Sequence, residues 1–159
     1  MIAILVIAHA PLATALLQCA RHVYGCDPEQ CETLDIAADA EPGAQIDIAR
    51  TLLASLNARE GVLVLTDLFG ATPANIAARL VVPGEVEVLA GVNLPMLLRV
   101  LTYRSAGPLA ALVEKAISGG TAGVIRITST APQDQHKSQR DANDPDSAKN
   151  EHARLHDQQ

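Results

Sequence analysis

Two uninterrupted aliphatic runs constrain the fold of this chain most strongly. They are IAILVIA at residues 2–8 and GVLVLTDLFG at residues 61–70. Because apolar and polar residues do not alternate along most of either run, both predict strands that are covered on two faces, as in a parallel sheet. The composition agrees, since 48% of the residues are hydrophobic but only 2% are aromatic, which leaves aliphatic side chains to fill the core. We therefore expect an α/β fold.

Segments with helical spacing separate these runs from shorter strands. Gly25 is expected to end the first helix. Thr72 is expected to cap the helix that follows the second run, with Pro73 at its first helical position. The expected order is strand 2–8, helix 11–24, strand 31–38, helix 41–58, strand 61–67, helix 72–81, strand 85–90, helix 95–103, helix 107–120 and a final edge strand at 122–129.

This alternation of strands and helices predicts an open, doubly wound, mainly parallel sheet with right-handed crossovers. Such sheets bind ligands beyond the carboxyl ends of their strands, where the strand order reverses. For a flavodoxin-like order 2-1-3-4, which sequence pattern alone does not fix, that point lies between the first and third strands. His9 ends the first strand and Asp67 ends the third, so both are expected at the rim of one crevice.

A histidine and a carboxylate at one rim can act together as a nucleophile. A carboxylate that accepts a hydrogen bond from one imidazole nitrogen fixes the tautomer and leaves a lone pair on the other nitrogen. Gly70, Ala71 and Thr72 add a helix start whose amides and hydroxyl suit a phosphoryl group, and Asn93 adds a polar side chain at the end of the next strand. These four residues are the candidate phosphoryl ligands beside the catalytic pair.

Each of these residues taken alone has an ordinary structural explanation, such as a turn or a helix cap. Their convergence on one crevice is what predicts a site. The chain has no GxGxxG or GxxxxGK[ST] motif, and no Lys or Arg lies near these loops in the sequence. A nucleotide would therefore lack a clamp for its polyphosphate, and a single transferable phosphoryl group fits better.

Charge and cysteine content exclude several other classes of protein. The formal net charge of −6 argues against binding to nucleic acids or anionic membranes. Three cysteines, Cys19, Cys26 and Cys31, are typical of a reduced, cytoplasmic protein rather than of a disulfide framework. Their spacing matches no zinc signature, so we expect no metal and a Cys19 buried in its helix. No apolar stretch reaches the roughly 20 residues that a membrane span needs.

The composition changes after Pro132. We expect one domain at residues 1–130 and a tail at 131–159. The tail carries mixed charges and a single large apolar residue, Leu155. It cannot bury enough surface to offset its conformational entropy, so we expect it to be disordered.

Three blocks, ILVIAHAP, GVLVLTDLFGATPANIAARL and VEVLAGVNLPMLLRVL, resemble the enzyme IIA component of the mannose family of the bacterial phosphoenolpyruvate-dependent sugar phosphotransferase system (PTS). The resemblance covers about residues 1–128. It implies a phosphoryl carrier without a cofactor, in which His9 accepts the group from HPr and passes it to a histidine of a IIB partner. Asp67 would orient the ring, and Thr72 with its helix start would hold the phosphoryl oxygens.

The resemblance also implies a homodimer that exchanges antiparallel C-terminal edge strands, here at about residues 123–128. Association with the membrane would come only through IIB and the IIC and IID components. Two departures from the family pattern stand near the site. Ala10 and Pro11 replace the glycine that commonly follows the histidine, so residue 11 cannot donate a backbone N–H. Residues 70–73 read Gly-Ala-Thr-Pro in place of Gly-Gly-Ser-Pro.

Three other functions use the same residues. The first is a phosphoryl donor subunit for dihydroxyacetone kinase. The second is a regulator whose phosphorylation at His9 is read by a partner, without a role in transport. The third is a module that binds a small anion and in which His9 is structural.

Overall fold

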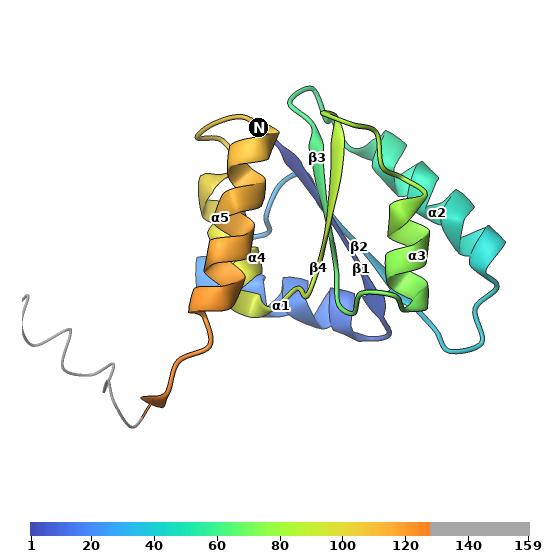
Figure 1. Ribbon diagram of the computed structural model, residues 1–159, viewed down its shortest axis with the longest axis horizontal. Coiled ribbons are helices and arrows are strands. Elements are labelled where there is room, and N and C mark those ends of the chain that lie inside the picture. Colours follow the sequence, from blue (N-terminus) through green and yellow to red (C-terminus); the bar gives the residue numbers. More distant parts are fainter. Residues whose placement is uncertain (128–159) are drawn as a thin grey trace, which may run out of the picture. The chain divides into compact units, whose positions relative to one another are not determined.

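A parallel sheet organises the computed structural model, which describes residues 1–127 (Figure 1). Within these residues the sheet has the order β2-β1-β3-β4, and all three neighbouring pairs are parallel. The strands are β1 (Ala3–His9), β2 (Cys31–Ile36), β3 (Val62–Thr66) and β4 (Val86–Ala90). The expected α/β class and the order 2-1-3-4 are confirmed.

Helices cover both faces of this sheet, as Figure 1 shows. One face packs against α1 (Leu12–Tyr24), α4 (Leu94–Tyr103) and α5 (Leu109–Ala122). The other packs against α2 (Pro42–Ser55) and α3 (Thr72–Ala78). Covering on two faces is the reason that β1 and β3 consist of almost continuous aliphatic residues.

Strand β1 lies at the centre and divides its side chains between the two layers. Ile4, Val6 and Ala8 belong to the core under α1, α4 and α5. Leu5 and Ile7 belong to the core under α2 and α3. Because side chains alternate along a strand, His9 falls on the α2–α3 face, at the carboxyl end of the sheet.

The structure corrects two local expectations. Thr72 does not cap α3, because Ala71 occupies the cap position with extended backbone, and no side chain bonds to the amides there. Thr72 is instead the first residue of the helix. Cys19 is exposed on α1 rather than buried, whereas Cys31 is buried in β2, and this burial raises the pKa of its thiol to about 11.

The expected edge strand at 122–129 is not formed in the part of the chain that the structure describes. Ala122 is still the last residue of α5, and residues 123–127 carry no strand. The rest of the expected strand lies outside the described residues.

Met1–Val124 form one compact unit, which contains the sheet and its helices. The expected tail at 131–159 lies outside the described residues, and the boundary at residue 130 stays a prediction. Within residues 1–127, no helix is long and apolar enough to cross a membrane.

Candidate functional site

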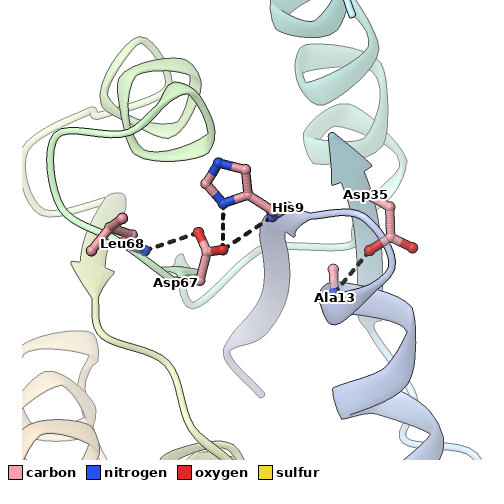
Figure 2. A network of polar contacts seen from close by, with 5 residues as sticks. All are labelled: His9, Ala13, Asp35, Asp67 and Leu68. Carbon is pink, nitrogen blue, oxygen red and sulfur yellow. Dashed lines mark hydrogen bonds and ion pairs between the residues drawn. The ribbon is translucent and has the colours of Figure 1, made fainter. Parts of the chain in front are cut away.

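His9 and Asp67 meet at the carboxyl end of the sheet. His9 is the last residue of β1, and Asp67 directly follows β3, the neighbouring strand. One carboxylate oxygen of Asp67, Oδ2, lies 2.7 Å from the ring Nδ1 of His9 and also accepts the backbone N–H of His9 at 3.1 Å. The carboxylate therefore holds both the ring and the main chain of the histidine (Figure 2).

The charge state of Asp67 decides the tautomer of His9. Partial burial raises the pKa of this carboxyl group, but hydrogen bonds from the His9 ring, the His9 amide and the Leu68 amide outweigh burial, so the pKa lies below its usual value. An ionised carboxylate only accepts hydrogen bonds, so Nδ1 must carry a proton, and in the neutral imidazole the lone pair is then on Nε2. In Figure 2 the second ring nitrogen points away from Asp67.

The His9 side chain is 49% exposed, whereas the Asp67 side chain is 13% exposed. This difference suits a nucleophile that is open to a reactant and an orienting group that is shielded from water. None of the hydrogen bonds found among residues 1–127 uses Nε2 of His9. The geometry thus presents a fixed imidazole with a free lone pair at the surface.

The loop after Asp67 is a tight turn into α3. Gly70 has φ +83°, a left-handed conformation that suits glycine. The Ala71 amide donates to the carbonyl oxygen of Leu68 at 3.2 Å, so this N–H is already used. Among the backbone hydrogen bonds of residues 1–127, none uses the amide of Gly70 or Thr72. Two donors of the expected phosphoryl loop are therefore free.

Asn75 and Arg79 are two polar residues of the α3 region that the sequence patterns did not single out. The Asn75 side-chain amide donates to the carbonyl oxygen of Gly70 at 3.4 Å. Arg79 lines a cavity of about 200 Å³ together with Thr72 and Asn75. The winding of α3 thus brings a cation to the same cavity as Thr72, from the other end of the helix.

Asn93 is occupied by structural contacts. Its Oδ1 accepts the Met96 amide at 2.9 Å and so caps α4, and its Nδ2 donates to the carbonyl oxygen of Gly120 at 3.0 Å. No hydrogen bond among the described residues joins Asn93 to His9 or Asp67. It lines a cavity of about 330 Å³ beside Leu89 and Ile117.

Asp35 is a further polar residue near the histidine that the patterns did not single out. It stands in β2 opposite Ala8, and its Oδ1 accepts the amide of Ala13 at 2.8 Å (Figure 2). The same oxygen accepts the amide of Thr14 at 3.3 Å. The cap position of α1 is Pro11, whose side chain cannot cap. An uncapped helix start in the sequence was the one signal for this contact, but it does not say which residue supplies the cap.

A third cavity, of about 240 Å³, lies beside Met1, Tyr24 and Arg104. None of these three cavities is lined by His9. Among residues 1–127, no group of three or more His, Cys, Asp or Glu residues is placed to hold a metal ion.

Comparison with protein-family models matches residues 3–117 to EIIA-man, the PTS system fructose IIA component. The matched range includes His9, Asp67 and the whole parallel sheet. The chain belongs to this EIIA family. It is a PTS EIIA component of the mannose type.

Curated relatives of this EIIA chain include the mannose-specific EIIAB components of Escherichia coli (strain K12) and Shigella flexneri. Each is 37% identical over 125 residues, which is 77% of this chain. The same alignment covers 38% of each relative, so the chain spans less than two-fifths of their length.

Two solved structures of EIIA proteins have folds similar to that of this chain. The phosphotransferase system component EIIA from Streptococcus agalactiae has a TM-score of 0.73 at 25% identity, over 82% of this chain and 100% of that one. The mannose/sorbose specific IIA subunit from Enterococcus faecalis has a TM-score of 0.67 at 21% identity, over 79% of this chain and 94% of that one. The second likeness shows the fold alone.

Proposed function

We propose that this EIIA chain carries a phosphoryl group on His9, accepts it from HPr and passes it to a histidine of a IIB partner. The observation that carries the proposal is the 2.7 Å contact between Nδ1 of His9 and Oδ2 of Asp67. It leaves Nε2 as the nucleophile and aims it outward from the end of β1. Membership of the EIIA family supports the same chemistry.

The transfer follows from this geometry. Nε2 attacks the phosphorus atom of a phosphohistidine in line with the breaking P–N bond. Because the other nitrogen of the donor ring is protonated, the donor imidazole leaves as a neutral ring. The new P–N bond places positive charge on the His9 ring, which keeps its proton on Nδ1. The Asp67 carboxylate stabilises that charge, so no proton has to leave during the transfer. Transfer to the next histidine reverses these steps.

The loop at residues 70–72 is the proposed cradle for the phosphoryl oxygens. The free amides of Gly70 and Thr72 and the Thr72 hydroxyl supply donors, while Ala71 fixes the backbone through its bond to Leu68. Asn93 is not included, because both ends of its amide already bond within the protein. The phosphoryl group must remain transferable, and a small set of neutral donors holds it without trapping it.

A labelling experiment tests the proposal. The protein is incubated with phosphoenolpyruvate and the two general carriers of the system, and the modified residue is mapped by mass spectrometry. We expect one acid-labile, base-stable phosphoryl group on His9, and none in the His9→Ala variant. Label on His9→Ala at the wild-type level would reject His9 as the acceptor.

A second step separates the carrier from its alternatives. Addition of the IIB partner should discharge phosphorylated His9. A chain that is phosphorylated but transfers nothing to IIB would be a regulatory switch, and discharge by dihydroxyacetone kinase instead would assign it to that pathway. Without any phosphorylation, the module that binds a small anion is the remaining function.

We also propose that the chain forms a homodimer by exchange of residues 123–128 as antiparallel edge strands, and that it acts in the cytoplasm, at the membrane only through IIB, IIC and IID. Two observations support the dimer. Strand β4 is at the edge of the sheet, and the side chains of Val124 and Ile127 are 84% and 75% exposed. Light scattering after chromatography should give a dimer, and the double change Ile125→Asp and Ile127→Asp should give a monomer.

A further inference from the structure

Arg104 carries a buried charge that has no ion-pair partner among residues 1–127. It directly follows α4 and is only 7% exposed. The ion pairs found in this part of the chain all join other residues. Burial of a guanidinium is costly unless hydrogen bonds or an opposite charge compensate it. An unpaired guanidinium at this depth is therefore a candidate partner for an anionic ligand.

One hydrogen bond accounts for only part of this guanidinium. Nη1 donates to the backbone carbonyl oxygen of Glu29, and within the described chain this is the only hydrogen bond of the group. A guanidinium has five N–H donors, so Nε and Nη2 have no protein acceptor there. The one side-chain polar atom of residues 1–127 that is both enclosed and unpartnered is Oγ1 of Thr66. Nε and Nη2 of Arg104 therefore remain open to solvent.

Arg104 lines the cavity of about 240 Å³ that also borders Met1. This cavity lies at the amino end of the sheet, where the Arg104 carbonyl oxygen accepts the amide of Ile2 at 3.0 Å. His9 is eight positions further along the chain than Met1, which is about 26 Å in an extended strand. The cavity is therefore separate from the site at His9.

Two acidic residues, Asp27 and Glu29, also line this cavity. Asp27 forms an ion pair with Arg21, which offsets its charge. Glu29 is exposed, and it is the backbone carbonyl oxygen of this residue that Arg104 holds. The charged side chain that is buried at the cavity is thus Arg104, a cation.

We propose that this cavity binds a small organic carboxylate, with its two oxygens on Nε and Nη2 of Arg104 and its apolar part against Pro28 and Leu101. The planar guanidinium matches a carboxylate through two parallel hydrogen bonds, whereas a phosphate group would bring a third oxygen that this fork does not reach. The volume equals that of about eight water molecules in the liquid, which admits a small acid but not a nucleotide. The site goes beyond the proposed function and needs no step at His9.

Two cysteines can report whether the cavity is occupied. Cys26 is exposed and lines the cavity, whereas Cys19 is exposed on α1 and does not line it. A bound acid should shield the Cys26 thiol from iodoacetamide, and mass spectrometry follows both thiols in one sample. With benzoate as the probe, alkylation of Cys26 should slow with a saturable dependence on benzoate concentration, by about threefold at twice Kd. Alkylation of Cys19 should not change, and sodium chloride at the same concentration should affect neither thiol.

Two comparisons test whether the charge of Arg104 is what binds the probe. Benzyl alcohol has the same ring without the carboxylate and should not protect Cys26. Arg104→Gln keeps a donor for the carbonyl oxygen of Glu29 but removes the charge, so benzoate should no longer protect Cys26 in this variant. The matched control is Arg50→Gln, which removes an exposed arginine of α2 and should leave the protection at the wild-type level.

Four results would overturn the proposal. They are no protection of Cys26 by benzoate, equal protection by benzyl alcohol, protection by inorganic phosphate but not by benzoate, and wild-type protection in Arg104→Gln. The first three are measured on the wild-type chain, so they decide the proposal even if Arg104→Gln does not fold. None of them depends on phosphorylation of His9, so failure of this proposal and failure of the proposed function are distinguishable.

Discussion

The loop after β1 and the loop after β3 both lead from a buried central strand into a helix, but the two helix starts are completed differently. At α1, the Asp35 carboxylate from β2 accepts the amides of Ala13 and Thr14. At α3, no side chain caps the helix, and the amides of Gly70 and Thr72 make no backbone hydrogen bond. His9 is the last residue of β1 before the first loop, and its partner Asp67 begins the second loop.

This difference assigns separate tasks to the two loops. The Asp35 carboxylate already accepts two amides at the start of α1, so an incoming anion would meet a like charge there. The loop before α3 keeps free donors and lies on the same face of the sheet as His9. The loop before α3 is therefore the one that keeps donors for the proposed phosphoryl group.

Substitution of Asp67, which begins the loop before α3, should have the largest effect on phosphoryl transfer. Asp67→Asn keeps the shape but can donate a hydrogen bond to the ring, which favours the wrong tautomer, and phosphoryl transfer to His9 should fall by about 100-fold or more. Rates with phosphorylated HPr and with phosphoramidate, a small molecule that phosphorylates histidine, should fall together, because the defect is in the nucleophile. Equal rates for Asp67→Asn and wild type would remove Asp67 from the mechanism.

Asp67 should also make the stability of the wild-type fold depend on pH, and Asp67→Asn should weaken that dependence. Because the folded pKa of Asp67 is lowered, its contribution to the free energy of unfolding is fully present above the ordinary aspartate pKa and is lost as pH falls through the folded value. Urea unfolding at several acidic pH values should show a smaller loss of stability in Asp67→Asn than in wild type. Asp39→Asn, at an exposed loop position, serves as the control.

Asp35 tests the start of α1, where its carboxylate accepts two helix amides. Asp35→Ala leaves the amides of Ala13 and Thr14 without an acceptor, so the free energy of unfolding should fall by about 1 kcal/mol. Asp35→Asn keeps an acceptor oxygen and should retain most of that stability. Denaturant unfolding gives both values, and an equal loss in the two variants would show that the hydrogen bonds are not what Asp35 contributes.

Thr72→Ala should have the smallest effect on stability. Since the Thr72 side chain does not cap α3, its removal should change the free energy of unfolding by less than about 0.5 kcal/mol. Phosphoryl transfer should still slow, because the hydroxyl is a proposed ligand of the phosphoryl oxygens. A loss of stability as large as that of Asp35→Ala would mean that Thr72 is a cap after all, and that the two helix starts are alike.

The central strands and the pairing of His9 with Asp67 were predictable from sequence for a physical reason. Aliphatic runs without polar alternation are stable only beneath helices on both faces, and in parallel sheets the carboxyl ends of such strands meet at one edge. Thr72 shows where local preference fails. Threonine favours cap positions, but the turn at Gly70 shifts the cap to Ala71.

Asp35 shows a second limit of prediction from sequence, which is contact between distant segments. Its contact with Ala13 joins residues 22 positions apart, and no local rule links a strand residue to the start of the preceding helix. Arg79 reaches the cavity beside Thr72 only because α3 winds both onto one side.

By itself, then, the sequence determined the order of the helices and of the four strands of the sheet and the two residues that meet at its carboxyl end, because burial of aliphatic runs leaves few alternatives. Only the tertiary structure showed that a carboxylate accepts amides at the start of α1, whereas the loop before α3 keeps donors without a backbone hydrogen bond. Hydrogen bonds between distant segments make that difference, and their partners are chosen by the packed fold.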